Sequence, residues 1–322
     1  MLQKMKIMTE KILVTGARGQ IGSELTLALR KIYGTENVLS TDLKNKDEVD
    51  DPYYESLNVM AAEWISEIVQ NHQITTVYHL AAMLSATAEK SPSKAWELNM
   101  TSLLTFLELA KDRKIQKLFW PSSIAIFGSE TPKYETAQNA MAIPETVYGI
   151  SKRAGEYWCK YYFDKFDVDV RSIRYPGLIS WKTPPGGGTT DYAVDIFYQA
   201  LESGHYECFL TEETALPMMY MDDAIRATIE LMQADPEKLS IRTSYNLNAL
   251  SFNPKELAEA IQKHLPDFTI SYKPDERQAI AATWPASIDD RVAQKDWHWK
   301  PAFSLEKMTA DMLMNLKEKS SK

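Results

Sequence analysis

The fold of this 322-residue chain is decided by the stretch Lys11-Ile-Leu-Val-Thr-Gly-Ala-Arg-Gly-Gln-Ile-Gly22. It opens with a short run of β-branched and apolar residues, which predicts a strand. Gly16, Gly19 and Gly22 follow at once, and apolar residues then recur at helical spacing as far as Ile32. A glycine turn between a strand and a helix lets a phosphate group approach free amides at the positive end of the helix dipole. The stretch therefore predicts a dinucleotide-binding loop.

An acidic residue supports this interpretation over the alternative of a plain turn before a helix. Asp42 ends the second predicted strand, twenty residues after Gly22. A carboxylate at this position accepts hydrogen bonds from the adenosine ribose and repels a 2′-phosphate, so we expect NAD in preference to NADP. Lys44 and Lys46 lie nearby and weigh against that preference. The expected contacts are Gly16, Arg18, Gly19, Gln20, Ile21 and Gly22 at the pyrophosphate, with Asp42 and Leu43 beyond them.

Strand and helix patterns alternate through the first half of the chain, which predicts an α/β fold with a doubly wound parallel sheet, the Rossmann fold. We assign residues 10–175 to this NAD-binding domain. Residues 176–316 form mainly a smaller C-terminal substrate-binding lobe, with allowance for segments that return to the Rossmann core. The expected strands are 11–15, 37–41, 76–80, 117–120 and 169–174, and the expected helices are 21–32, 61–71, 99–111, 148–166, 192–202, 222–234 and 254–263.

The composition excludes several classes of protein. A formal net charge of −8 disfavours nucleic-acid binding, which needs a clustered positive face. The sequence contains no apolar run of about 18 residues, so we expect no membrane span. It also contains no spacing of metal ligands, so we expect no metal site. Cys159 and Cys208 are too few for a disulfide framework and fit a reducing compartment. The N-terminus lacks the apolar run of a signal peptide, so we expect a cytoplasmic protein, with a removed organelle presequence left open.

Tyr148 and Lys152 stand four residues apart, on one face of the expected helix 148–166. A phenol with a pKa near 10 is a poor base at neutral pH. A nearby ammonium, together with the positive charge of an oxidised nicotinamide, lowers the pKa of the phenol by stabilising the phenolate. The phenolate can then take a proton from a substrate hydroxyl. The alternative is a buried structural tyrosine.

Spacing alone is a weak signal here, because Tyr161 and Lys165 repeat it later in the same helix. We expect that second pair to lie in a cluster of core and surface aromatic residues. Ser122 and Ser123 come at the end of the strand expected at 117–120. Ligands of an open parallel sheet lie at the carboxyl ends of its strands, so Ser123 is expected to hydrogen-bond the reacting oxygen.

Taken in order, these motifs resemble those of the extended short-chain dehydrogenase/reductases. The resemblance also rests on His79-Leu-Ala-Ala82, Asn99 and Tyr175-Pro-Gly177, and it covers nearly the whole chain. It implies catalysis by Ser123, Tyr148 and Lys152. It also implies a homodimer formed through the helices at 99–111 and 148–166. The further NAD contacts that it implies are Asn58, Val59, Leu80, Ala81, Ala82, Asn99, Tyr148, Lys152 and Tyr175, although Asn58 stands where many relatives carry Asp.

Within that family the chain is similar to the short-chain type of L-threonine 3-dehydrogenase. Three segments carry this narrower resemblance: 121–128 (PSSIAIFG), 185–193 (PGGGTTDYA) and 283–289 (TWPASID). It implies oxidation of the L-threonine β-hydroxyl, or that of a similar β-hydroxy amino acid, to 2-amino-3-oxobutanoate. The residues that it places around this substrate are Ser85, Ser123, Tyr148, Gly187, Thr189, Thr190 and Trp284.

Several alternatives stay open at this point. Trp284 can be a packed core indole, and Thr189 or Thr190 can be an ordinary cap of the helix at 192–202. Arg174 and Arg277 are candidate clamps for a substrate carboxylate. The competing functions are a nucleotide-sugar epimerase or dehydratase, which would share the NAD site, and a non-catalytic NAD-binding sensor.

Overall fold

The computed structural model describes residues 10–186 and 188–320. Six parallel strands form its central sheet, in the order β3-β2-β1-β4-β5-β7. This order and direction confirm the predicted α/β fold with a doubly wound sheet. The strands are β1 (Ile12–Thr15), β2 (Val38–Asp42), β3 (Tyr54–Ser56), β4 (Thr76–His79), β5 (Lys117–Phe119) and β7 (Asp169–Arg171).

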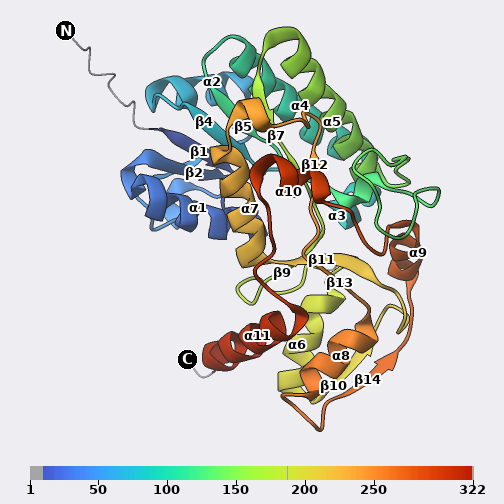
Figure 1. Ribbon diagram of the computed structural model, residues 1–322. Coiled ribbons are helices and arrows are strands. Elements are labelled where there is room, and N and C mark those ends of the chain that lie inside the picture. Colours follow the sequence, from blue (N-terminus) through green and yellow to red (C-terminus); the bar gives the residue numbers. More distant parts are fainter. Residues whose placement is uncertain (1–9, 187, 321–322) are drawn as a thin grey trace.

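Both faces of the sheet are covered by helices because successive strand residues point to opposite sides. Ile12 and Val14 pack on one face with helices α1 and α7, whereas Leu13 packs on the other with α2 and α4. Figure 1 shows the resulting three layers. The first face carries α1 (Gln20–Tyr33), α7 (Met221–Gln233) and α10 (Arg291–Trp297), and the second carries α2 (Ala62–Asn71), α4 (Pro92–Lys111) and α5 (Val147–Phe166).

Part of the second half of the chain builds a separate lobe below the sheet (Figure 1), whereas α7 and α10 pack on the sheet itself. Its hydrophobic core is distinct from the two cores of the central sheet. A capping box between Asn253 and Glu256 confirms the predicted start of α8. The lobe contains α6 (Tyr192–Glu202), α8 (Pro254–Gln262), α9 (Glu276–Thr283) and α11 (Leu305–Ser320), with β9 (Gly177–Ile179), β10 (His205–Cys208), β11 (Leu216–Tyr220), β13 (Leu250–Phe252) and β14 (Thr269–Tyr272).

A small sheet joins the two parts, in the order β12-β8-β6. Its strands are β6 (Ser122–Ser123), β8 (Ile173–Tyr175) and β12 (Tyr245–Asn246). The single strand predicted at 169–174 was therefore wrong. The chain leaves the central sheet after Arg171 and enters this second sheet at Ile173, where it pairs with β6 and β12.

Helix α4 begins at Pro92 instead of Asn99, with the proline in its first turn, where the missing N–H costs nothing. A short helix, α3 (Ser85–Lys90), precedes it and was not predicted. The short 3₁₀ segments are η1 (Thr35–Asn37), η2 (Lys46–Glu48), η3 (Ile124–Ile126) and η4 (Pro236–Lys238). Within residues 10–186 and 188–320, no helix has the length and apolar character needed to cross a membrane.

Candidate active site

The glycine loop between β1 and α1 is packed so closely that two of its positions exclude a side chain. Gly16 has a φ of +67°, and an added Cβ there would lie 2.8 Å from the backbone nitrogen of Ala81. An added Cβ at Gly22 would lie 2.1 Å from the Gly16 carbonyl oxygen. Gly19 stands at the N-cap of α1 and donates its amide to the Gly16 carbonyl at 3.1 Å. This compact loop at a helix N-terminus has the form that a pyrophosphate requires.

Asp42 lies beside this loop at the end of β2. Its carboxylate accepts the amides of Arg18 at 2.9 Å and of Leu43 at 2.8 Å. Both carboxylate oxygens retain further lone pairs that a ribose hydroxyl can use. The nearby Lys44 ammonium lies 3.8 Å from the Glu48 carboxylate. The acceptor oxygens of Asp42 at this edge of the sheet therefore suit the hydroxyl groups of a ribose.

The residues expected at the adenine lie just beyond β3. Asn58 is exposed, and its side-chain oxygen accepts the amide of Met60 at 3.0 Å. The next residue, Val59, is buried. Leu80, Ala81 and Ala82 follow β4 and are half-buried, as are Gln20 and Ile21 at the start of α1.

Asn99, another residue expected to contact NAD, joins three segments of the chain by hydrogen bonds. Its side chain accepts the Met83 amide at 2.8 Å and donates to the Ser151 hydroxyl at 3.2 Å. Tyr175 lies deeper: its ring packs against Phe119 and its hydroxyl is hydrogen-bonded to Thr228. Any contact between Tyr175 and a cofactor would therefore come from its backbone.

Lys152 points toward the end of β5, where the chain enters β6. Its ammonium donates to the Pro121 carbonyl at 2.6 Å and lies 5.5 Å from the centre of the Tyr148 ring. Burial lowers the pKa of Lys152 to about 7. Its charge also acts on His79, whose pKa is lowered first by burial and second by this ammonium.

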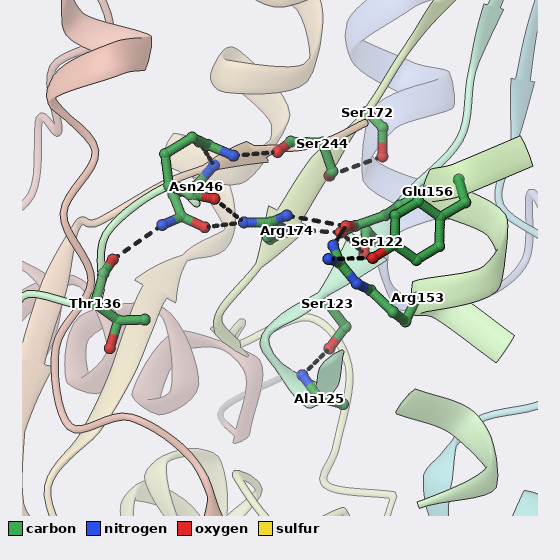
Figure 2. A network of polar contacts seen from close by, with 12 residues as sticks. Ser122, Ser123, Ala125, Thr136, Arg153, Glu156, Ser172, Arg174, Ser244 and Asn246 are labelled. Atoms are coloured by element: carbon green, nitrogen blue, oxygen red, sulfur yellow. Dashed lines mark hydrogen bonds and ion pairs between the residues drawn. The ribbon is translucent and has the colours of Figure 1, made fainter. Parts of the chain in front are cut away.

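The phenol of Tyr148 lies beside Ser123. Burial raises the pKa of Tyr148 to about 12, and a hydrogen bond with the Ser123 hydroxyl acts in the opposite direction. For the chain by itself, desolvation of the phenolate is the largest influence on this pKa, and it opposes the direction expected from the sequence with an oxidised nicotinamide in place. Ser123 is half-buried and also accepts the Ala125 amide at 3.2 Å, as Figure 2 shows.

Two glycines let α5 approach the strand ends. An added Cβ at Gly149 would lie 2.0 Å from the Ala125 carbonyl oxygen, and one at Gly155 would lie 2.3 Å from the Trp120 ring. The Thr146 hydroxyl caps the helix by accepting the Gly149 amide at 3.0 Å. The second pair, Tyr161 and Lys165, is exposed on the outer side of α5. Only the first pair is thus brought to the serines.

Of the residues expected around the substrate, Thr189 is buried and Thr190 is half-buried. Neither caps α6, because Asp191 occupies the N-cap position. Trp284 is 7% exposed and belongs to the core of the lobe, as a packed indole would. Gly187 and the side chain of Ser85 lie outside the described residues.

The two candidate carboxylate clamps are already engaged, so the structure corrects that expectation. Arg277 binds both carboxylate oxygens of Asp275 and stacks over the Phe209 ring at 3.2 Å from its centre. Arg174 is 3% exposed and binds both carboxylate oxygens of Glu156.

Three acidic residues near the site were not predicted. Asp191 accepts the amides of Gly186 at 2.6 Å and Gly188 at 2.8 Å, and so shapes the glycine segment before Thr189. Glu89 of α3 accepts the Val147 amide at 2.8 Å, directly before Tyr148. Glu156 pairs with Arg174. An acidic residue that closely follows a glycine run, such as Asp191, can be expected to accept hydrogen bonds from the preceding backbone amides. Glu89 and Glu156 have no such local signal, because their partners are distant in the chain.

Among the described side chains, no group of three or more histidine, cysteine, aspartate or glutamate residues is placed to bind a metal ion. The polar groups of Ser123, Tyr148 and Lys152 at the strand ends are a hydroxyl, a phenol and an ammonium.

Comparison with known proteins extends these observations. The NAD dependent epimerase/dehydratase family matches residues 12–247. An uncharacterized epimerase/dehydratase of Staphylococcus haemolyticus is 49% identical over 314 residues, which are 96% of this chain and 98% of that protein. The holo form of the GalE-like L-threonine dehydrogenase from Cupriavidus necator is 57% identical, with a TM-score of 0.93, over 95% of this chain and 99% of that one. A monomeric L-threonine 3-dehydrogenase from a metagenome, in its apo form, is 50% identical, with a TM-score of 0.91, over 95% of this chain and 99% of that one.

Proposed function

The chain belongs to the NAD dependent epimerase/dehydratase family, and on this premise we propose that it oxidises the 3-hydroxyl of L-threonine to 2-amino-3-oxobutanoate with NAD. The proposal is supported by the threonine dehydrogenases that share about half of its residues over nearly the whole chain. The observation that carries it is the meeting of Tyr148, Lys152 and Ser123 at the carboxyl ends of the strands.

NAD, when bound, supplies the acceptor for the hydride that leaves C3 of threonine. Tyr148 is the general base: its phenolate takes the proton of the 3-hydroxyl as the carbonyl forms. Ser123 donates its hydroxyl to the reacting oxygen and holds it next to the phenol. Lys152 and Tyr148 favour each other's charged form, because an ammonium lowers the pKa of a neighbouring phenol and a phenolate raises that of the amine.

The cofactor residues divide by position. Gly16 to Gly22 hold the pyrophosphate, and Asp42 accepts from the adenosine ribose. The half-buried residues after β4, together with Asn99, are assigned to the part of NAD that extends toward Tyr148. Each of these assignments is supported by close backbone packing or by free acceptor capacity described above.

The amino-acid substrate lies between this site and the lobe. Thr189 offers hydroxyl and amide donors to its carboxylate, and Trp284 shapes a small pocket, with Ser85, Gly187 and Thr190 completing the surroundings. Asp191 supports this arrangement because it holds the backbone just before Thr189. A loop of this kind can close over substrate.

One assay separates this function from its alternatives. Purified protein is mixed with NAD and L-threonine, and the NADH absorbance band is followed, with a panel of nucleotide sugars in parallel. We expect net NADH with threonine and no conversion of the sugars. A nucleotide-sugar epimerase would convert a sugar without net NADH, and a non-catalytic sensor would bind NAD and turn over nothing.

We further propose a homodimer formed through α4 and α5. The outer side of α5 exposes Tyr157, Trp158 and Tyr161, which line a hollow of about 510 Å³. Trp96 of α4 is also 44% exposed. Exposed apolar side chains gathered in this way are typical of a protein interface. Sedimentation should give twice the chain mass, and Trp158→Glu should halve it; a monomeric wild type contradicts the proposal.

Both cysteines are free and buried, which is compatible with a reducing compartment. A cytoplasmic location accordingly stays our proposal, and fractionation of cells that produce the protein tests it.

A further inference from the structure

A buried ion pair lies directly behind the proposed catalytic residues. Glu156 of α5 is fully buried, and Arg174 of β8 is 3% exposed. The Arg174 guanidinium donates to Glu156 Oε1 at 2.8 Å and to Oε2 at 2.9 Å, a two-pronged contact that fixes orientation as well as distance. Figure 2 shows this pair at the centre of a polar network.

The other partners of Glu156 are sequence neighbours of the catalytic residues. Ser122 donates its hydroxyl to Glu156 Oε1 at 2.7 Å, and Ser122 directly precedes Ser123. Arg153 donates to Glu156 Oε2 at 2.8 Å, and Arg153 directly follows Lys152. One carboxylate therefore holds the serine strand and the catalytic helix at a fixed separation.

The helix itself strengthens this link. Tyr148, Lys152 and Glu156 are spaced by four residues, so they form one stripe along α5 that faces the strand ends. A displacement of Glu156 is therefore passed along a rigid helix to Lys152 and Tyr148.

The other side of Arg174 reaches toward the lobe. Its second terminal nitrogen donates to the Gln138 carbonyl at 2.8 Å and to the Asn246 side-chain oxygen at 2.9 Å. Asn246 in turn donates to the carbonyls of Thr136 at 3.0 Å and Asp289 at 3.3 Å. Asp289 ends the segment 283–289, which contains Trp284. The hydrogen bonds therefore connect the segment proposed to line the substrate pocket to the serines of β6.

A buried ion pair is a weak source of stability, because desolvation of the two charges offsets most of their attraction. We propose that Glu156 and Arg174 are positioning residues, which set Ser123 against Tyr148 and couple that geometry to the segment carrying Trp284. This inference rests on the proposed function for its kinetic test, and on geometry alone for its structural test.

Arg171 provides a matched control. It is 4% exposed in β7 and binds both oxygens of Asp169, at 2.9 and 2.8 Å. Its remaining donors go to carbonyls at the end of α7, including Leu231 and Ala234, away from the serines. Arg171→Lys and Arg174→Lys both keep a buried charge and lose a two-pronged contact with a carboxylate. Only Arg174→Lys changes the hydrogen bonds that link Glu156 to Asn246.

The kinetic experiment measures kcat, KM and the pH profile of kcat for both variants. We expect Arg174→Lys to lower kcat on the order of 10²-fold, the effect of a misplacement of about 1 Å, with KM for NAD little changed. The acid limb of its kcat profile should move to higher pH, because the Ser123 hydroxyl, which lowers the pKa of Tyr148, moves away from the phenol. Arg171→Lys should keep the wild-type kcat and profile even where its melting temperature falls. Equal kcat losses in both variants, or none in Arg174→Lys, overturn the proposal.

Crystal structures of the two variants test the proposal without any measurement of enzyme activity. Arg174→Lys should separate the Ser123 hydroxyl from the Tyr148 phenol, and Arg171→Lys should leave them together. If Arg174→Lys does not fold, Glu156→Asp, which keeps the charge and shortens the side chain, takes its place with the same expected results. Failure of wild-type protein to oxidise threonine would overturn the proposed function, while the variant structures still decide whether the pair positions Ser123.

Discussion

The Lys152 ammonium donates a buried hydrogen bond of 2.6 Å to the carbonyl oxygen of Pro121. Pro121 immediately precedes the two serines of β6, so this bond joins the catalytic helix to the strand end where the reacting oxygen is proposed to lie. It also holds the ammonium within 5.5 Å of the Tyr148 ring centre, where its charge favours the phenolate.

Lys152→Met removes this charge from beside the phenol. Because the pKa of Tyr148 then lies higher, the acid limb of the kcat profile should move to higher pH. At neutral pH kcat should fall by roughly 10²- to 10⁴-fold, the usual range for loss of acid–base assistance. Steady-state rates of NADH formation between pH 6 and 10 measure both effects. Lys160→Met, on the exposed side of the same helix, is the control and should keep the wild-type profile; an unshifted profile for Lys152→Met contradicts the assigned role.

Asp42→Ala tests the choice of cofactor. Loss of the carboxylate should raise KM for NAD about 10- to 100-fold, the equivalent of a charge-assisted hydrogen bond. It should also permit oxidation with NADP, because the repulsion of a 2′-phosphate disappears. Asp47→Ala removes an exposed carboxylate five residues further on and should change neither constant. Unaltered cofactor preference in Asp42→Ala would exclude a ribose contact.

Gly149→Ala tests the close approach of α5 to the serines. The new Cβ would lie 2.0 Å from the Ala125 carbonyl oxygen, so the helix must move outward. Overpacking of this kind costs about 1–3 kcal/mol of unfolding free energy, and kcat should fall because Tyr148 moves with the helix. Urea unfolding and NADH assays measure the two effects. Ile150→Ala changes the next residue, which is 45% exposed, and should alter both quantities far less.

His79→Gln tests a buried histidine between two hydroxyls. The His79 ring nitrogens lie 2.8 Å from the Thr15 hydroxyl and 2.9 Å from that of Ser102. Ser102 donates its own proton to the Leu98 carbonyl, so His79 Nε2 carries the hydrogen and Nδ1 accepts from Thr15. Burial lowers the pKa of His79 to about 3, so the neutral ring satisfies both partners.

The sign of the pH effect follows from proton binding. Between pH 6.5 and about 3 the unfolded chain binds a proton at this histidine and the folded chain does not. The contribution of His79 to the free energy of unfolding is therefore complete above pH 6.5 and is lost as the pH falls below that value. From pH 6.5 to 5, wild type should lose about 2 kcal/mol more unfolding free energy than His79→Gln. Urea denaturation at the two pH values measures the difference; parallel losses would mean that His79 is charged in the fold.

The local features of the site were predictable because they depend on neighbours in sequence. The glycine loop and Asp42 lie within one strand–helix–strand unit, and Tyr148 and Lys152 lie within one helical turn. Hydrophobic periodicity placed the main strands and helices for the same reason. The spacing of Tyr161 and Lys165 was identical. The structure separates the two pairs because Tyr148 is half-buried and Lys152 buried, whereas both residues of the second pair are exposed.

The remaining features depend on distant contacts and on desolvation. Glu156 and Arg174 are unremarkable charges in sequence, and their pairing appears only when α5 packs on β8. Arg174 was expected as a candidate clamp for the substrate carboxylate because no neighbouring residue in the sequence indicated that its partner is Glu156. Likewise, the spacing of Tyr148 and Lys152 gives the sign of their interaction but not the cost of burying the phenol, which raises its pKa to about 12.

The rate of NADH formation by Tyr148→Phe, with saturating L-threonine and NAD, decides whether the phenol is the base. Phenylalanine keeps the ring and its packing and removes only the hydroxyl. We expect kcat to fall by about 10²- to 10⁴-fold while the variant still binds NADH with wild-type affinity. A kcat equal to that of wild type would contradict the assignment of Tyr148 and, with it, the proposed mechanism.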